Sequence, residues 1–345
     1  LAVTVNGKSL ENGVDFIVNP SSGGLNGSFT TCFVNTADLM NNRTFKRLKK
    51  SGCKGKVLVI DTIAKGNKVA DERKQIVLQR FQGQALIEIE HKLTWGVGRS
   101  ANSYGAVKIK AGVLDIEAMK AEPFTIEFDI ENEFVKGYEA YNVCGMIEGT
   151  RRADSFVFFT AHYDHLGRMG KDTYIPGAND NASGVAMMLD MARHFKENPP
   201  EYSVVFIGFG GEEAGLVGSY YFVKQMREYL EPEKIRFVIN MDLMGSGEKG
   251  IMAVNGKVFK GAFEILKEIN DKNQYLPVVK SRGKAANSDH YFFSESGIPA
   301  FFFYLMGEYK FYHEVDDSAE NLRLGEYYDK SFRLIRDFLE AIQDI

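Results

Sequence analysis

The sequence predicts a mixed α/β protein, with a mostly parallel sheet flanked by helices and a smaller β-rich accessory domain before it. The chain has 345 residues, 44% of them hydrophobic, which suits two cores better than one. From Tyr141 onward, apolar strand-like runs alternate with amphipathic helix-like segments. Before about residue 135 the pattern is short β-rich runs between turns. We therefore expect an accessory domain at 1–134 and a second domain at 135–345.

The accessory domain is predicted from runs rich in β-forming residues that are separated by Gly-, Asn- and Lys-rich turns. The expected strands are Lys56–Asp61, Ala85–His91 and Phe124–Ile130. This portion has one histidine, His91, and no cluster of residue types that would support catalysis. It is expected to contribute structure rather than chemistry.

The second domain is predicted from alternating strand and helix patterns, which are typical of a parallel sheet covered by helices. The expected strands are Val143–Ile147, Phe156–Ala161, Val204–Phe209, Phe237–Asn240 and Ala300–Tyr304. The expected helices are Ala182–Phe195, Ser219–Tyr229, Lys257–Asn270 and Gly325–Ile342. The aromatic run Phe301–Tyr304 is interpreted as a core strand rather than a substrate platform.

Charge and hydropathy exclude several classes of protein. Lys and Arg total 42 against 46 Asp and Glu, a net charge of -4, which favours neither a nucleic-acid surface nor a polybasic membrane patch. The longest apolar stretches, such as Ile298–Met306, are too short to cross a bilayer. The chain begins at Leu1 rather than Met, so we expect that an upstream segment, which could have included a secretion signal, has been removed or omitted. The protein is expected to be exported to the periplasm, cell surface or medium.

The three cysteines give no metal or redox signature. Cys32, Cys53 and Cys144 are widely spaced, lack a CxxC pair and cannot all form intramolecular disulfides. They are predicted to be small buried hydrophobic residues.

Polar side chains follow each expected strand of the second domain. In parallel sheets, ligands bind beyond the carboxyl ends of the strands, so these residues should meet at one edge. The set is His162 and Asp164 after the second strand, Glu212 and Glu213 after the third, Asp242 after the fourth, His313 after the last, and Asp180 in the loop GANDNASG before a helix. The sequence predicts a site that combines imidazoles with several carboxylates.

This mixture of ligands suits zinc, because zinc accepts nitrogen and oxygen donors, whereas magnesium does not favour histidine. Asp180, Glu213 and Asp242 supply three negative charges, and a bridging hydroxide would supply the fourth needed to balance two Zn²⁺ ions. Without cations the crowded carboxylates would repel one another, and some would have to bind protons. Two zinc ions are therefore expected.

Each signal also has a structural interpretation. A single acidic residue in a Gly-rich loop is usually a solvated turn residue, and His162 with Asp164 could be a half-buried pair at a strand end. Functionally, Asp164 would fix the tautomer of His162. Glu212 and Glu213 leave a buried strand in tandem, so one can bind metal while the other faces water. His165 is assigned to the structural or surface residues.

With these residues assigned, the chain resembles the co-catalytic di-zinc aminopeptidases, whose relatives include glutamate carboxypeptidase II, the transferrin receptor ectodomain and the glutaminyl cyclases. The matching strings, in the family's order, are TAHYDHLG, PGANDNASG, FGGEEAGLVGS, NMDLMG, SDHYFF and FYHEVDD. The resemblance implies a phosphorylase/hydrolase-like fold of the zinc-peptidase type. It also implies that His162, Asp180 and Asp242 hold one zinc and that Asp180, Glu213 and His313 hold the other.

The same resemblance assigns roles and a reaction. Glu212 matches the general base, and Tyr312 matches a tyrosine that donates a hydrogen bond to the tetrahedral oxyanion. The expected function is a zinc exopeptidase, most simply an aminopeptidase that acts on peptides through a metal-bridging hydroxide. The first portion looks like the protease-associated domain that many members insert, and Lys56–Asp61 fits its β character.

Two alternatives remain open from the sequence, as does the oligomeric state. A carboxypeptidase or dipeptidase would need a cation for the terminal carboxylate, which Arg282 or Lys284 could supply. A catalytically silent binding module is the other alternative, but such proteins lose metal ligands, and no expected ligand is missing from this chain.

Overall fold

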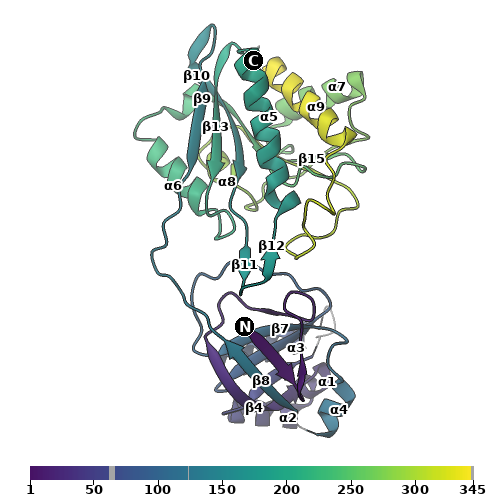
Figure 1. The fold of residues 1–345 in the computed structure, drawn as a ribbon. Coiled ribbons are helices and arrows are strands. Elements are labelled where there is room, and N and C mark those ends of the chain that lie inside the picture. Colours follow the sequence, from purple (N-terminus) through teal and green to yellow (C-terminus); the bar gives the residue numbers. More distant parts are fainter. Residues whose placement is uncertain (62–66, 123, 343–345) are drawn as a thin grey trace. The chain divides into compact units, whose positions relative to one another are not determined.

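The computed structural model describes residues 1–61, 67–122 and 124–342, which form two compact units (Figure 1). Unit 1 comprises Leu1–Gly137 together with Arg168–Tyr174, and unit 2 comprises Tyr138–Gly167 and Ile175–Ile345. The division in the chain lies three residues beyond the predicted 134/135 boundary. The later segment Arg168–Tyr174 also groups with unit 1, and the sequence pattern did not predict this.

Unit 1 is built on one eight-stranded sheet in the order β2-β1-β8-β4-β5-β6-β7-β3. Neighbouring strands β4, β5, β6 and β7 are parallel, and the outer pairings are antiparallel. The strands are β1 (Ala2–Val5), β2 (Lys8–Ser9), β3 (Phe16–Val18), β4 (Leu25–Val34), β5 (Val57–Ile60), β6 (Ala85–Glu90), β7 (Gly105–Lys110) and β8 (Thr125–Ile130). The three strands expected in this portion are confirmed as β5, β6 and β8.

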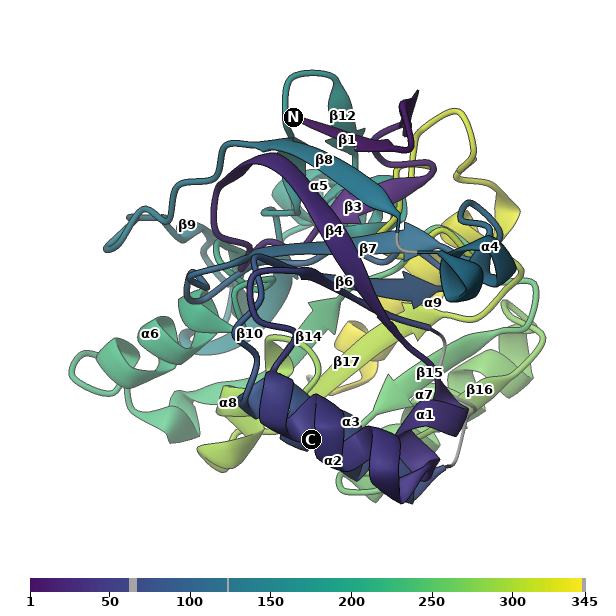
Figure 2. The same cartoon turned by 90° about the horizontal axis from the view of Figure 1, so that it is seen from below.

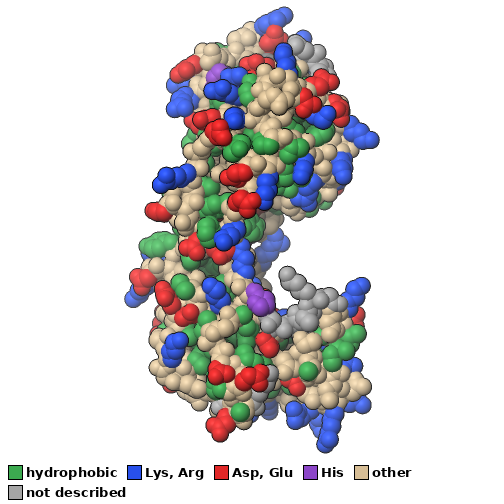
Figure 3. Space-filling view, turned by 90° about the vertical axis from the view of Figure 1, so that its right-hand side faces the viewer, with side chains coloured by type: hydrophobic (Ala, Val, Ile, Leu, Met, Phe, Trp, Pro, Cys, Tyr) green, Lys and Arg blue, Asp and Glu red, His purple; other side chains and the backbone are tan. Residues whose placement is uncertain are grey.

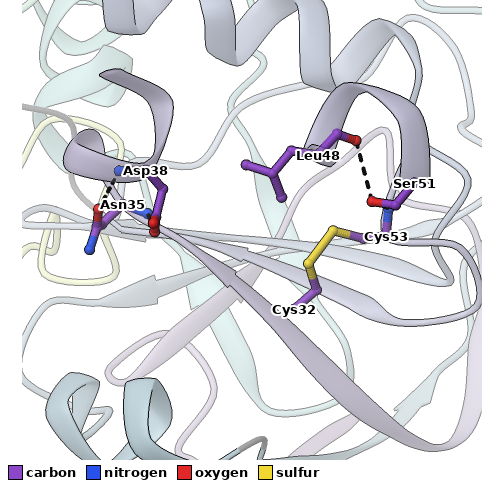
Figure 4. Close-up of a disulfide and its surroundings, with 6 residues drawn as sticks. All are labelled: Cys32, Asn35, Asp38, Leu48, Ser51 and Cys53. Atoms are coloured by element: carbon purple, nitrogen blue, oxygen red, sulfur yellow. Dashed lines mark hydrogen bonds between the residues drawn. A yellow bond between two sulfur atoms is a disulfide. The ribbon is translucent and has the colours of Figure 1, made fainter. Parts of the chain in front are cut away.

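The helices of unit 1 connect these strands. They are α1 (Thr36–Met40), α2 (Asn42–Ser51), α3 (Lys68–Gln79) and α4 (Ile116–Ala121). Figure 2 shows α2 and α3 side by side. Helix α1 begins with a capping box, in which the Asn35 side chain accepts from the Asp38 N–H and the Asp38 carboxylate accepts from the Asn35 N–H (Figure 4).

A disulfide joins Cys32 on β4 to Cys53 just after α2 (Figure 4), with a Cα–Cα separation of 6.1 Å. The prediction that all three cysteines are buried small hydrophobic residues was therefore wrong. Cys144 is free but exposed, because it lies on an edge strand. Sequence spacing alone does not reveal that strand β4 and the turn after α2 bring two cysteines together.

Unit 2 contains a seven-stranded sheet in the order β16-β15-β17-β14-β10-β13-β9. Its four central strands, β17, β14, β10 and β13, are parallel. The strands are β9 (Val143–Ile147), β10 (Arg152–His162), β13 (Tyr202–Phe209), β14 (Ile235–Met241), β15 (Ile251–Val254), β16 (Val279–Ser281) and β17 (Ala300–Leu305). The predicted mixed, mostly parallel sheet is confirmed.

Helices cover both faces of this sheet (Figure 1). Side chains of α5, α7 and α9 pack on one face with Phe159 and Phe301, and side chains of α6 and α8 pack on the other with Phe158. The helices are α5 (Ser183–Glu197), α6 (Val217–Met226), α7 (Lys260–Asn273), α8 (His290–Glu295) and α9 (Glu326–Ile342). This gives the three layers expected for the fold class.

In unit 2, the differences from the predicted elements are confined to short segments. Strands β15 and β16 and helix α8 were not predicted, because each is too short to show a clear period. A small hairpin of β11 (Gly167–Met169) and β12 (Thr173–Ile175) leads into a π-helical turn, η1 (Ala178–Ala182), just before α5. Among the described residues, no helix has both the length and the apolar character needed to cross a membrane.

Candidate active site

The sheet of unit 2 delivers the predicted site residues to one edge. His162 is the last residue of β10, and Asp242 directly follows β14. Glu212 and Glu213 follow β13, and His313 lies in the loop after β17. All four strands are parallel neighbours, so their carboxyl ends meet at the same edge.

Asp180 occupies the centre of the cluster. Its Oδ1 lies 3.2 Å from Nε2 of His162, and its Oδ2 lies 3.0 Å from Nε2 of His313. The carboxylate is nearly fully buried and sits in η1, where its own backbone dihedrals are non-helical. Its two oxygens therefore face two different histidines, as in a carboxylate that bridges two metal ions.

Two further carboxylates complete two groups of donors. Asp242 Oδ1 lies 3.5 Å from His162 Nε2, and Glu213 Oε2 lies 3.3 Å from His313 Nε2. One group is thus His162, Asp180 and Asp242, and the other is Asp180, Glu213 and His313. Donor atoms of His162, Asp180 and Glu213 all lie within 4.8 Å of one another. These are the five side chains predicted as metal ligands.

One of the donor atoms lacks a hydrogen-bond partner among the described residues, and a bound cation could take the place of that partner. Asp242 Oδ1 is buried and accepts no hydrogen bond from the described part of the chain. Asp242 is held from its other oxygen, Oδ2, to which the Ser288 hydroxyl donates at 2.9 Å. An orphaned carboxylate oxygen aimed at a histidine nitrogen is the arrangement that a bound zinc ion would satisfy.

Burial and the neighbouring carboxylates shift the pKa values of His162 and His313 in opposite directions. Burial alone would lower the pKa of His313, but the Asp180 and Glu213 carboxylates outweigh it and raise that pKa to about 10. The pKa of His162 is likewise raised, because the Asp242 and Asp180 carboxylates overcome burial. In the metal-free site the histidines thus bind protons to offset the surrounding negative charge.

Glu212 differs from its neighbour. Burial raises the pKa of Glu212 to about 9, and nearby carboxylates such as Asp289 and Asp242 add to the shift. Glu213 has its pKa lowered, because hydrogen bonds from His165 and His313 overcome the effect of burial. The tandem glutamates therefore have different environments, one proton-binding and one anionic.

Asp164 makes contacts that differ in part from those expected. The Nδ1 atom of His162 lies 3.0 Å from the main-chain oxygen of Asp164 and 3.8 Å from its carboxylate. The Asp164 carboxylate instead accepts hydrogen bonds from the backbone N–H groups of Glu212, at 3.1 Å, and Glu213, at 3.3 Å. The peptide carbonyl is thus the nearer partner of His162, and the side chain fixes the turn that carries both glutamates.

Tyr312 lies beside the donor cluster. Its ring stacks on His313, with centroids 3.8 Å apart, and the side chain is about half exposed. Burial and the carboxylates around it, Asp180 first, raise its pKa above the usual range for tyrosine. The hydroxyl therefore keeps its proton and is available as a hydrogen-bond donor.

Sequence reasoning missed two residues that contact this cluster. His165 was assigned to the structural or surface residues, yet its Nδ1 lies 2.8 Å from Oε1 of Glu213. Asp317 is fully buried and accepts hydrogen bonds from the backbone that carries Asp180. Both lie inside matched strings, TAHYDHLG and FYHEVDD, which were the available signals.

The segment that contains these site residues matches a known family of peptidases. The model of Peptidase family M28 matches residues 142–338. The chain belongs to this family. The matched residues contain every side chain of the two donor groups, and the predicted membership is confirmed.

Two aminopeptidases are similar to part of this chain. Aminopeptidase YwaD of Bacillus subtilis is 32% identical over 177 residues, which is 48% of this chain and 36% of that protein. An aminopeptidase of Pseudomonas aeruginosa is 37% identical over 123 residues, 35% of this chain and 21% of that protein. The matched part of this M28 chain thus spans 36% of the length of the first relative and 21% of the length of the second.

Solved structures support the fold. The structure of BSAP, a zinc aminopeptidase from Bacillus subtilis, superposes with a TM-score of 0.69 and 20% identity, covering 99% of this chain and 81% of that one. At this level of identity the likeness shows the fold alone. The function of this M28 chain has to be argued from its own site.

Proposed function

We propose that this protein is a zinc-dependent aminopeptidase that binds two zinc ions and removes N-terminal residues from peptides. The observation that carries the proposal is Asp180, whose two oxygens face His162 at 3.2 Å and His313 at 3.0 Å. Asp242 completes the donor group on the first side and Glu213 the group on the second. Aminopeptidases among the similar proteins of the same family support this reading.

Zinc bound by these residues would supply Lewis acidity, lowering the pKa of a water and polarising the scissile carbonyl. Glu212 provides proton transfer. The elevated pKa of its buried carboxyl belongs to the metal-free site. Two bound zinc ions would lower it, so that the carboxylate can take a proton from the attacking water and deliver it to the leaving amine near neutral pH. Asp164 holds the backbone of Glu212 in place for this task.

Tyr312 supplies the remaining polar group. Because its hydroxyl stays protonated, it can donate a hydrogen bond to the oxyanion that develops on the substrate carbonyl. Its ring is stacked against His313, which fixes the direction from which it approaches the donor cluster.

The charge of the site favours a substrate amine over a terminal carboxylate. Zinc would balance the three donor carboxylates, but the Asp164 and Glu212 carboxylates beside them add negative charge that would attract a protonated N-terminal amine. Lys284, a candidate anchor for a terminal carboxylate, forms an ion pair with Glu295 instead. The other candidate, Arg282, has its Nη1 3.5 Å from the Tyr304 hydroxyl.

The test compares one peptide in three forms: free, N-acetylated and C-amidated. We expect the free and amidated forms to be cleaved, the acetylated form to resist, and a chelator to abolish cleavage until zinc is restored. Elemental analysis should find two zinc ions per chain. Cleavage of the acetylated form but not the amidated form would indicate a carboxypeptidase, and no cleavage of any form by zinc-loaded protein would indicate a binding module.

The accessory role of unit 1 and an exported location belong to the same proposal. Unit 1 is taken to be a protease-associated domain, which its separate β-rich sheet supports. Export is supported by the disulfide between Cys32 and Cys53, because such bonds persist in oxidising compartments. Thiol counting on freshly isolated, unreduced protein should find Cys144 alone reactive. Three free thiols in protein from its native compartment would contradict export.

A further inference from the structure

Asp317 is a fully buried carboxylate that lies four residues after His313 and that the proposed chemistry does not use. Its Oδ1 accepts the backbone N–H of Asn179 at 2.7 Å, and its Oδ2 accepts the backbone N–H of Asp180 at 3.1 Å. Its main-chain oxygen also accepts the N–H of Ala178 at 3.0 Å. One residue thus binds three consecutive amides of the turn that carries the central carboxylate.

The same carboxylate is fixed from the other side. The Tyr309 hydroxyl donates to Asp317 Oδ1 at 2.7 Å, so the side chain is held by its own loop as well as by η1. That loop, from residue 306 to 317, also carries His313, whose backbone has a positive φ of 59°. Asp317 therefore ties together the two segments that present Asp180 and His313.

The hydrogen bonds of Asp317 help to set the distance between the Asp180 carboxylate and His313, on which binding of a pair of metal ions depends. The turn around Asp180 has non-helical dihedrals and its first residues cannot obtain all their backbone hydrogen bonds from a regular helix. An acceptor with two oxygens satisfies adjacent N–H groups at once and leaves little freedom to the peptide between them. The Asp180 side chain is then directed before any ion arrives, with Oδ2 3.0 Å from His313 Nε2.

We infer that Asp317 is a positioning residue that preorganises Asp180 for metal and thereby sets the zinc affinity of the site. It touches no donor atom of the proposed ligands, so it acts through the backbone of η1 rather than on the reaction itself. The inference rests on the proposed zinc site. A buried residue with a merely structural role would affect stability but not the affinity for zinc.

The first test is a zinc titration of Asp317→Asn in competition with a chromophoric chelator. Asparagine keeps the shape but has a single acceptor oxygen, so one backbone N–H of η1 loses its partner. We expect zinc affinity to fall about 10- to 100-fold, as for other groups that orient metal ligands, while kcat at saturating zinc stays within a few-fold of wild type. Wild-type zinc affinity in this variant would overturn the inference.

A second measurement needs no metal. In zinc-free wild-type protein, hydrogen exchange should be slow at the amides of Asn179 and Asp180. In Asp317→Asn it should become fast at the amide that loses its acceptor. Tyr309→Phe is a milder variant that removes one donor to Asp317 and leaves both backbone bonds. It is expected to weaken zinc binding only a few-fold, and it keeps the inference testable if Asp317→Asn fails to fold, since unchanged affinity would count against it.

The matched control is Asp190→Asn on α5, which disturbs another carboxylate bonded to a tyrosine, through the Tyr328 hydroxyl at 2.8 Å. It should lower the melting temperature without changing zinc affinity. An equal loss of affinity in Asp190→Asn would overturn the positioning role. If wild-type protein binds zinc and cleaves peptides, and Asp317→Asn binds zinc with the wild-type affinity, only the positioning role of Asp317 is contradicted. If wild-type protein binds no zinc, the proposed function fails with it.

Discussion

The two units of this chain share an architecture but differ in what they bury. Each contains a sheet whose central strands are parallel and apolar, with helices between the strands. In unit 1, no described ionisable side chain is buried, and the buried polar residues are Ser22, Thr31 and Thr173. In unit 2, the buried acidic residues and histidines are His162, Asp180, Asp242, Asp289, His290 and Asp317.

The difference shows where function resides on such a fold. Burying a charge is costly unless it is paired or bound to a metal, so a protein that buries several at one sheet edge must offset that cost. On the face shown in Figure 3, acidic and basic side chains are intermingled, as expected for solvated surface charge. The cluster in unit 2 is different because its carboxylates lie inside the protein, next to histidines.

The largest effect is expected from Glu212→Gln in unit 2. The change removes proton transfer but preserves size, so turnover should fall by about 10² to 10⁴ while zinc content and fold are kept. Steady-state assays with elemental analysis would measure both. Glu88→Gln in unit 1 is the matched control and should leave turnover unchanged. Near wild-type turnover in Glu212→Gln would remove this residue from the mechanism.

The next effect is a loss of zinc, which we compare between one histidine of each unit. The two variants are His162→Ala in unit 2 and His91→Ala in unit 1. His162 is buried beside Asp180 and Asp242, whereas His91 is exposed on unit 1. We expect zinc content to fall toward one ion per chain in His162→Ala and to stay at the wild-type value in His91→Ala. Elemental analysis after dialysis against trace chelator measures this. Full zinc content in both variants would contradict the ligand assignment.

Much of this contrast could be predicted from the sequence. Strands and helices with clear periodicity in unit 2 were placed correctly, and the rule that ligands bind beyond the carboxyl ends of parallel strands brought the site residues other than Asp180 to one edge. The resemblance to the di-zinc aminopeptidases implied which five of the site residues are the donors. The contacts of Asp317 and His165 could not be predicted, because they depend on how loops far apart in the chain come together. Asp180 and Asp317 are 137 residues apart, and His165 and Glu213 are 48 residues apart. The disulfide was missed for the same reason.

Core truncations of equal size should separate fold from site. Ile87 on β6 and Ile239 on β14 are both fully buried at the centre of their sheets. Either change to Ala should cost about 2 to 5 kcal/mol of unfolding free energy in its own unit. Ile239→Ala should also weaken zinc binding, because β14 carries Asp242, whereas Ile87→Ala should not. Chelator competition alongside thermal melts would show whether zinc binding depends on unit 2 alone.

The smallest effect is a pH dependence that only unit 2 should show. Burial lowers the pKa of His290 to about 4 in the folded protein, against an ordinary value of 6.5. Because the folded pKa is depressed, its contribution to stability is present above pH 6.5 and is lost as the pH falls toward 4. The shift corresponds to roughly 3 kcal/mol.

His290→Met retains bulk and removes this titration, so the difference in stability between variant and wild type should change between pH 7 and pH 4 in the variant's favour. Denaturant melts of zinc-free protein at both pH values measure it, since metal release then cannot contribute. His91→Met, at an exposed site on unit 1, is the control for the effect of a histidine-to-methionine change itself. A pH-independent difference for His290→Met would mean that the folded protein accepts a charged imidazole at this position, and the contrast between the two units would then rest on the donor cluster alone.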